Sequence, residues 1–359
     1  MQSIVPTQYW HVADDGRLVC DVCPRACKLQ EGQQGLCFVR ARQNDRIVLT
    51  SYGRSSGFCI DPIEKKPLNH FLPGSAVLSF GTAGCNLSCK FCQNWDISKA
   101  REMDRLCNQA EPERIAEVAA GHQCRSVAFT YNDPVIFLEY ANDTADACHQ
   151  LGIQTVAVTA AYINSSAGQD FFSHVDAANI DLKAFTDRFY RKICGGHLQP
   201  VLDTIQYLHD ETQVWMELTT LIIAGENDSE AEIRAMSDWV MDNLGPDVPM
   251  HFSAFHPDWK MRDKPATALQ SLINARQYAM QSGINYVYTG NVHYQPGDTT
   301  YCPNCQSVPI ERDWYNLNHW QLTPDGCCSH CGYKPAGVFD RQPGNWGAKR
   351  LPVNIQANF

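Results

Sequence analysis

The 359-residue sequence has no apolar run long enough to cross a lipid bilayer, which requires about 20 residues. Its start, Met1 to Pro6, lacks a basic stretch followed by an apolar one, so we expect no secretory signal peptide. Net positive charge is also absent, since the formal net charge is -10. These absences predict a cytoplasmic protein and disfavour binding to membranes or nucleic acid, whose anionic surfaces attract basic proteins.

The sequence also lacks the dispersed cysteines of a disulfide framework. Of its 17 cysteines, twelve fall into three short groups, at 20–37, 85–92 and 302–331. In a reducing compartment, grouped cysteines indicate metal ligands. We expect the other five to be single buried thiols. They are Cys59, Cys107, Cys124, Cys148 and Cys194.

The middle group has the spacing Cys85-x3-Cys89-x2-Cys92 and follows an apolar run that predicts a buried strand. Three thiolates are able to hold three corners of an iron–sulfur cube, which ordinarily takes four cysteines. One iron would then keep an open position, which is typical of metal sites that perform chemistry. A structural zinc site or a chance cluster of buried thiols is the alternative.

Four further cysteines near the N-terminus have the spacing Cys20-x2-Cys23-x3-Cys27-x9-Cys37. The residues around them are turn formers with little apolar periodicity, so a bound metal would supply stability that a small core lacks. Four cysteines suit zinc, slightly favoured, or an accessory iron–sulfur cluster, and free loop thiols are the remaining alternative. We therefore predict an N-terminal metal-binding segment, 1–74, that ends in a proline-flanked connector.

Strand-like and helix-like segments alternate between residues 75 and 296. The expected strands are 76–81, 126–130, 154–159, 178–182, 214–223, 250–255 and 286–288, and the expected helices lie near 112–121, 134–151, 199–209, 229–243 and 267–282. Alternation predicts parallel strands with right-handed crossovers. The fold class is therefore α/β, a partial or full (β/α) TIM-like barrel. A doubly wound sheet is the alternative, but no G-x-G-x-x-G supports it.

Active sites of such barrels lie at the carboxyl ends of the strands. The sequence places Asp133, Asp181, Lys183 and His251 there, with His256 shortly after. Each has a structural alternative. Asp133 is a candidate helix cap before Pro134, Asp181 and Lys183 are a candidate ion pair, and the histidines are candidates for a core and a surface position.

The last segment, 297–359, changes character. It contains two C-x2-C pairs, Cys302 with Cys305 and Cys328 with Cys331. Paired knuckles about twenty residues apart predict a zinc ribbon, with a rubredoxin-like iron site as the rival. Cys327 does not fit the spacing. The scattered basic residues favour a structural cap over a nucleic-acid reader.

The loop from Cys85 to Trp95 resembles the signature of the radical S-adenosylmethionine (SAM) superfamily. The resemblance implies that Cys85, Cys89 and Cys92 hold a [4Fe-4S] cluster and that SAM binds the fourth iron. An electron from the cluster then cleaves SAM to a 5′-deoxyadenosyl radical. Phe91 would pack beside the adenine.

The whole chain is similar to the AmmeMemoRadiSam-system radical SAM enzymes, relatives of pyruvate formate-lyase activating enzymes. The resemblance rests on eight motifs: Cys20–Cys27, Asp61–Leu68, Cys85–Trp95, Thr130–Pro134, Asp181–Lys183, His251–Asp258, Gly290–Val292 and Tyr301–Cys305. By this resemblance, Asn132 and Asp133 belong to the motif that holds the SAM ammonium. Asp181, Lys183 and His251 would contact the rest of SAM.

Two positions depart from the family pattern. Asp133 stands where the family usually has Glu, so its shorter side chain reaches SAM less directly. Ala160 and Ala161 replace Asn-Gly after the third strand, which puts a polar contact from that loop in doubt.

The implied reaction is hydrogen abstraction from an unknown substrate, for which glycyl-radical-enzyme activation is one candidate. The expected partners are an electron donor such as flavodoxin or ferredoxin and a protein or peptide substrate, with AMMECR-type and Memo-type proteins as candidate associates. Radical modification of a small molecule or RNA is an alternative. A protein of another class, a non-catalytic metal-stapled binding protein, is the further alternative.

Overall fold

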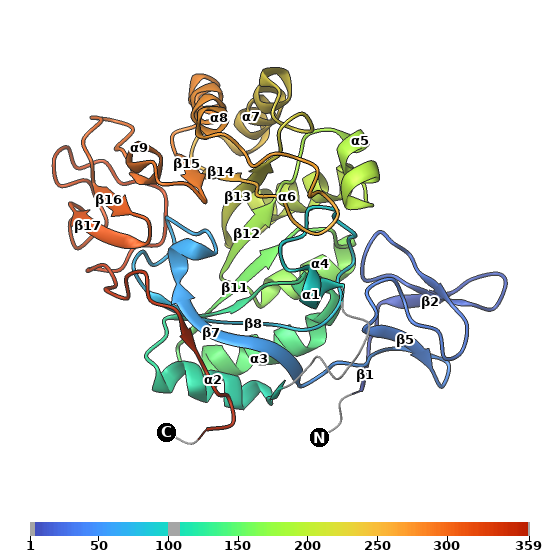
Figure 1. Cartoon of the computed structure of the whole chain (residues 1–359). Coiled ribbons are helices and arrows are strands. Elements are labelled where there is room, and N and C mark those ends of the chain that lie inside the picture. The colour runs from blue at the N-terminus through green and yellow to red at the C-terminus, as the bar shows by residue number, and fades with distance from the viewer. Residues whose placement is uncertain (1–3, 100–107, 358–359) are drawn as a thin grey trace.

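The computed structural model describes residues 4–99 and 108–357 (Figure 1). Cys107 lies outside these residues. The other four single cysteines, Cys59, Cys124, Cys148 and Cys194, are buried free thiols as predicted. No helix in the described part of the chain is long and apolar enough to span a bilayer.

A ten-stranded sheet forms the centre of the molecule. Its parallel strands are β8 (Ala76–Gly81), β10 (Ser126–Phe129), β11 (Gln154–Thr159), β12 (Ala177–Asp181), β13 (Trp215–Ile222), β14 (Met250–Ala254) and β15 (Val287–Gly290). They pair in this order. Most of their side chains are buried on both faces, as expected for a parallel sheet covered by helices.

The sheet is an open, partial barrel rather than a closed one. Within the described residues, β15 ends one edge, and the other edge is extended by antiparallel strands beyond β8. These are β7 (Arg54–Pro62), β18 (Leu351–Pro352) and the short β9 (Asn108–Gln109). The predicted α/β fold of the partial-barrel type is thereby confirmed.

Helices follow the strands and cover the outer face of the sheet (Figure 1). The longer ones are α2 (Pro112–Gly121), α3 (Leu138–Gln150), α4 (Ser165–Ser173), α6 (Gln199–Glu211), α7 (Glu230–Leu244) and α8 (Leu269–Gln281). Short helical turns are η1 (Ile63–Lys65), α1 (Trp95–Ser98), η3 (Pro134–Phe137), α5 (Asp187–Phe189) with η4 (Tyr190–Cys194), and α9 (Gln295–Asp298). The sequence did not predict α4, whose core contact is limited to a few residues.

Both η3 and α7 begin at a side-chain cap, and the cap at Asp133 was predicted. The Asp133 carboxylate accepts a hydrogen bond from the Val135 N–H (3.2 Å), and the Ser229 hydroxyl accepts one from the Glu232 N–H (3.3 Å). The Glu232 carboxylate does not close the capping box, because it accepts the Phe185 N–H instead (2.8 Å). It thereby ties α7 to the loop after β12.

The two cysteine-rich ends lie on opposite sides of the sheet in Figure 1. The N-terminal side contains β1 (Val5–Pro6), β2 (Trp10–Val12), β3 (Leu18–Cys20), β4 (Lys28–Leu29), β5 (Arg40–Gln43) and β6 (Arg46–Leu49), in two small antiparallel sheets. The C-terminal side contains the hairpin of β16 (Ile310–Asp313) and β17 (Asn316–Trp320).

Candidate active site

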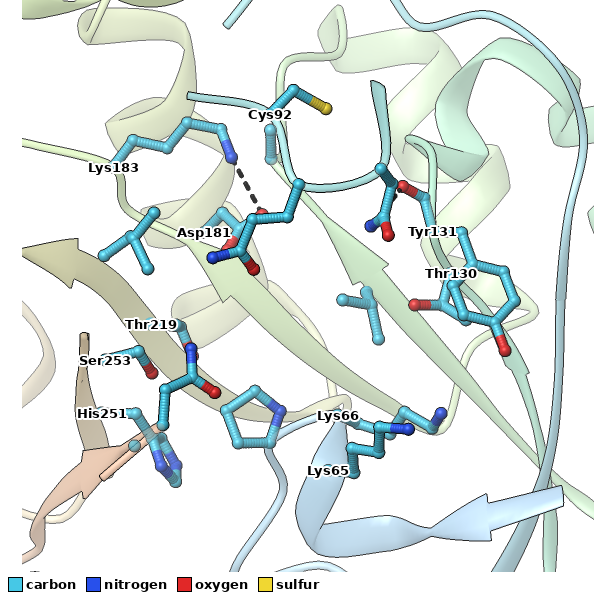
Figure 2. Close-up of a pocket in the computed structure, with 18 of the residues that line it drawn as sticks. Lys65, Lys66, Cys92, Thr130, Tyr131, Asp181, Lys183, Thr219, His251 and Ser253 are labelled. Atoms are coloured by element: carbon cyan, nitrogen blue, oxygen red, sulfur yellow. Dashed lines mark hydrogen bonds and ion pairs between the residues drawn. The ribbon is translucent and has the colours of Figure 1, made fainter. Parts of the chain in front are cut away.

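A cavity of about 450 Å³ opens at the carboxyl ends of the parallel strands. All the site residues predicted for the cluster and SAM line it: Cys85, Cys89, Phe91, Cys92, Asn132, Asp133, Asp181, Lys183 and His251. Figure 2 shows Cys92, Asp181 and Lys183 on one wall and His251 with Ser253 on another. His256 is exposed and does not belong to the lining.

The loop after β8 is shaped by backbone contacts. Gly84 has a φ of +88°, and a Cβ there would lie 1.8 Å from the Cys37 carbonyl oxygen, so no other residue fits. The Asn132 amide accepts the Thr82 N–H (3.0 Å) and donates to the Gly84 carbonyl (3.0 Å). Asn132 therefore holds the cysteine loop in place, and its amide is already engaged.

The three loop thiols differ in their surroundings. A hydrogen bond with Cys194 lowers the pKa of Cys89 to about 7. The positive charge of Lys183 also lowers this pKa, whereas burial of the thiol acts to raise it. Burial raises the pKa of Cys85 to about 12. Metal coordination deprotonates a thiol outright. Three sulfurs on one cavity wall beside a lysine thus suit an iron–sulfur cluster with an open position.

Asp133 is buried and already has three hydrogen-bond donors. Besides capping η3, it accepts the Thr159 hydroxyl (2.8 Å) and the Ala160 N–H (3.0 Å). Burial raises the pKa of Asp133 above its usual range, although these hydrogen bonds act to lower it. The backbone of Ala160 therefore contributes a polar contact even though its side chain cannot.

Asp181 and Lys183 form an ion pair at the end of β12 with a 2.9 Å separation (Figure 2). The Lys183 ammonium also lies 5.8 Å from the centre of the Phe91 ring. Burial alone would lower the pKa of Lys183, but Asp181 and the Cys89 thiol raise it well above its ordinary value. Lys183 therefore stays protonated and places a positive charge beside the cysteine loop in the cavity.

His251 is held by a carboxylate that the sequence analysis missed. The Glu217 carboxylate lies 2.7 Å from its Nε2, and both side chains are almost fully buried. Glu217 also accepts the backbone N–H groups of Asn69 (2.9 Å) and His70 (2.7 Å). A lone Glu within the apolar run of β13 was the available signal. His251 is therefore both a packed core residue and a cavity residue.

Four polar side chains of the cavity lining contain buried atoms without a hydrogen-bond partner among the described residues: Glu64 Oε2, Thr289 Oγ1, Asp298 Oδ2 and Arg312 Nε. These atoms are covered by protein, and Arg312 Nε still lies 3.8 Å from Glu64 Oε1 in an ion pair. The charged and polar side chains of this part of the lining suit a polar ligand. Arg312, with Trp314 and Tyr315, reaches the lining from the C-terminal segment, which sequence spacing did not reveal.

The four C-terminal cysteines are close enough together to bind one metal ion. The sulfurs of Cys302, Cys305, Cys328 and Cys331 all lie within 4.8 Å of one another, and Cys327 is outside the group, as predicted. Cys302 and Cys331 are 3.6 Å apart, and Cys305 and Cys328 are 3.9 Å apart. A tetrahedral metal with sulfur at about 2.3 Å requires sulfurs about 3.8 Å apart.

The N-terminal cysteines line a second, smaller cavity. Its walls include Cys20, Cys23, Cys27 and Cys37 together with Arg25, Arg40 and Asn86. All four predicted N-terminal metal-site cysteines therefore converge on one space.

Comparisons with known proteins agree with this geometry. Residues 80–239 match the Radical SAM superfamily. The chain is 38% identical to the uncharacterized protein MJ0808 of Methanocaldococcus jannaschii, over 91% of this chain and 97% of that protein. It is 25% identical to GTP 3′,8-cyclase of Lactiplantibacillus plantarum, over 65% and 75% of the two chains.

Two further likenesses are weaker. The chain is 22% identical to the 4-hydroxyphenylacetate decarboxylase activating enzyme of Clostridioides difficile, over 62% of this chain and 71% of that enzyme. A solved radical SAM methyltransferase from Sphaerobacter thermophilus gives a TM-score of 0.48 at 12% identity, over 83% of this chain and 79% of that chain.

An open parallel α/β sheet with three cysteines on the loop after β8 defines the class of this protein. Residues 80–239 form a domain of the Radical SAM superfamily, whose members catalyse radical reactions, and the chain is related to activating enzymes and other radical SAM enzymes. The chain shares nearly its full length with the M. jannaschii protein. Superfamily membership implies a [4Fe-4S] cluster and SAM as cofactors.

Proposed function

We propose that this protein is a radical SAM enzyme of the activating-enzyme type, an oxidoreductase that binds a [4Fe-4S] cluster through Cys85, Cys89 and Cys92. With one electron from an external low-potential donor, the cluster supplies reductive cleavage of SAM to methionine and a 5′-deoxyadenosyl radical. A substrate bound in the cavity would then give up a hydrogen atom to that radical.

One observation carries the proposal. Three thiols from one loop share a cavity with the adjacent, partly buried ammonium of Lys183 and with Asp181. The SAM carboxylate needs a cation and its ammonium needs a carboxylate or carbonyl. Lys183 and Asp181 supply these two groups beside the thiols, and Phe91 offers an aromatic surface.

The substrate would occupy the part of the cavity near Glu64 and Arg312, whose charged side chains belong to its lining. Relatedness to an activating enzyme supports a peptide or protein loop, with glycyl-radical activation as the reaction. The motifs shared with AmmeMemoRadiSam-system enzymes support AMMECR-type and Memo-type proteins as associates. A flavodoxin- or ferredoxin-type protein would donate the electron.

The C-terminal four-cysteine group would hold structural zinc. Its sulfur spacing matches one tetrahedral ion, and Arg312, Trp314 and Tyr315 of the same segment line the main cavity. The metal would thus fix one wall of the cavity.

The test is an anaerobic assay of reconstituted full-length protein with SAM and dithionite, which measures 5′-deoxyadenosine and, separately, SAM binding. Wild type and Cys124→Ala, a matched buried-thiol control outside the cavity, should form 5′-deoxyadenosine. Cys85→Ala should not. Wild-type protein that contains a cluster but neither binds SAM nor forms 5′-deoxyadenosine would overturn the proposal.

A further inference from the structure

The proposed function assigns no role to the N-terminal cavity. Its four thiols come from β3, the turn after it and the loop before β5, and they converge on one space of about 20 Å³. Four thiols that converge from separate elements suit a bound group that takes four sulfurs. The remaining question is whether that group is one ion or a cluster.

Sulfur spacing distinguishes the two. Within the described part of the chain, only the C-terminal set brings three or more candidate ligand atoms within 4.8 Å of one another. The N-terminal set lines one cavity without meeting that limit. Four thiolates on one zinc ion must be close, whereas each thiolate of a cubane binds a different iron and the sulfurs are further apart. The wider arrangement favours a cluster.

The surrounding charges suit an anionic cluster. Arg25 and Arg40 both line the cavity. Arg40 is buried, and its guanidinium donates to the Ile136 carbonyl (2.9 Å) and in bidentate fashion to Glu139. It is therefore a fixed cation beside thiolates, which stabilises their negative charge in a poorly solvated place.

The N-terminal cavity adjoins the main cysteine loop. Asn86, which lines the N-terminal cavity, directly follows Cys85 in the main site, and its carbonyl accepts the Arg25 Nε–H (3.0 Å). The Cys37 carbonyl packs against Gly84, on the other side of Cys85. A single stretch of backbone, residues 84–86, thus separates the two cysteine sites.

We propose that Cys20, Cys23, Cys27 and Cys37 hold a second [4Fe-4S] cluster, and that this cluster relays electrons to the main one. This proposal reverses the slight preference for zinc that was expected from the cysteine spacing alone. The relay, which rests on the proposed function, accepts one electron from a flavodoxin- or ferredoxin-type donor and gives one electron to the main cluster. No bond forms or breaks at the second cluster.

The test counts iron, sulfide and zinc in anaerobically reconstituted full-length variants and records Mössbauer spectra. Wild type should hold about eight irons and eight sulfides, and the variant with Cys85, Cys89 and Cys92 changed to Ala about four of each, since each cubane contains four. Cys20→Ser/Cys23→Ser should also hold about four. Cys305→Ser, a control in the other four-cysteine group, should keep all the iron.

Iron-free protein in the triple variant, with zinc bound to the N-terminal cysteines, would overturn the inference while leaving the proposed function to its own assay. The double variant, with its main cluster intact, tests the relay: it should lose the fast phase of reduction by a reduced flavodoxin in stopped-flow experiments. A fast phase equal to that of wild type contradicts the relay.

Discussion

The two ends of this chain each contribute four cysteines, yet the structure arranges them differently. The C-terminal sulfurs lie close enough for one tetrahedral ion, and Cys331 is exposed. The N-terminal sulfurs are spread around a cavity that contains the buried Arg40 and adjoins the main loop. Two sets of four cysteines therefore need not bind the same metal group, because the spacing of the sulfurs and the neighbouring residues decide whether a single ion or a cluster fits.

The two ends also touch the main cavity in different ways. The C-terminal segment contributes wall residues, Arg312, Trp314 and Tyr315, at the end where a substrate would bind. The N-terminal segment contacts the backbone on both sides of Cys85, at the end where the cluster would bind. We therefore expect substitutions in the N-terminal segment to affect the cysteine loop, and substitutions in the C-terminal segment to affect the cavity wall near the substrate.

The largest expected effect comes from the main loop itself. Cys89→Ala should reduce 5′-deoxyadenosine formation to background, because a two-thiolate site does not retain the cluster. Cys327→Ala, a cysteine outside every metal group, should match wild type. The readout is 5′-deoxyadenosine by liquid chromatography and mass spectrometry. A Cys89→Ala protein with wild-type formation contradicts the cluster assignment.

The next effect concerns stability at the N-terminal end. Arg40→Met should lower the free energy of unfolding by about 3–5 kcal/mol, because it leaves the largely buried Glu139 carboxylate without its bidentate partner. Denaturant unfolding followed by circular dichroism measures the change. Arg17→Met, which breaks an exposed pair with Asp15 in the same segment, should cause no measurable change. An equal loss of unfolding free energy in Arg40→Met and Arg17→Met would contradict a special stabilising role of the buried Arg40–Glu139 pair.

Arg40→Met/Glu139→Leu sharpens this test. Replacing both members of a buried pair with apolar groups is often close to neutral, so the double variant should recover most of the lost stability. Failure to recover would show that Arg40 acts through the cavity thiols rather than through Glu139.

Affinity for SAM should respond to Lys183. Lys183→Met removes a cation beside the thiols, and a hydrogen bond to a charged group contributes about 1.5–3 kcal/mol, which corresponds to roughly 10–100-fold weaker binding. Equilibrium dialysis with the reconstituted protein measures the dissociation constant. Lys192→Met, an exposed control on η4, should leave it unchanged. An unaltered constant in Lys183→Met would exclude a contact between Lys183 and SAM.

The smallest effect on the cluster is expected at the C-terminal end. Cys305→Ser should lose the proposed zinc and increase proteolysis within 297–359, because that metal would stabilise the hairpin of β16 and β17. Cys327→Ser should keep the zinc. Elemental analysis and mass mapping of proteolytic fragments provide the measurements, and retained zinc in Cys305→Ser would contradict the four-cysteine assignment.

Sequence patterns predicted much of the sheet because its parallel strands are apolar runs separated by helices. They did not predict β7, whose Ser- and Gly-containing sequence has little alternation and which pairs antiparallel with β8. The sequence motif identified the cysteine loop. Arg312 and Glu217 were missed, because only the folded chain brings them to the cavity and to His251.

In the proposed mechanism, the main cluster would keep an open iron that SAM binds. Electron paramagnetic resonance of the reduced Cys20→Ser/Cys23→Ser variant tests it directly, because only the main cluster contributes to that spectrum. We expect SAM to change the spectrum, since its amino and carboxylate groups would become ligands of the open iron. A spectrum that is identical with and without saturating SAM would contradict it.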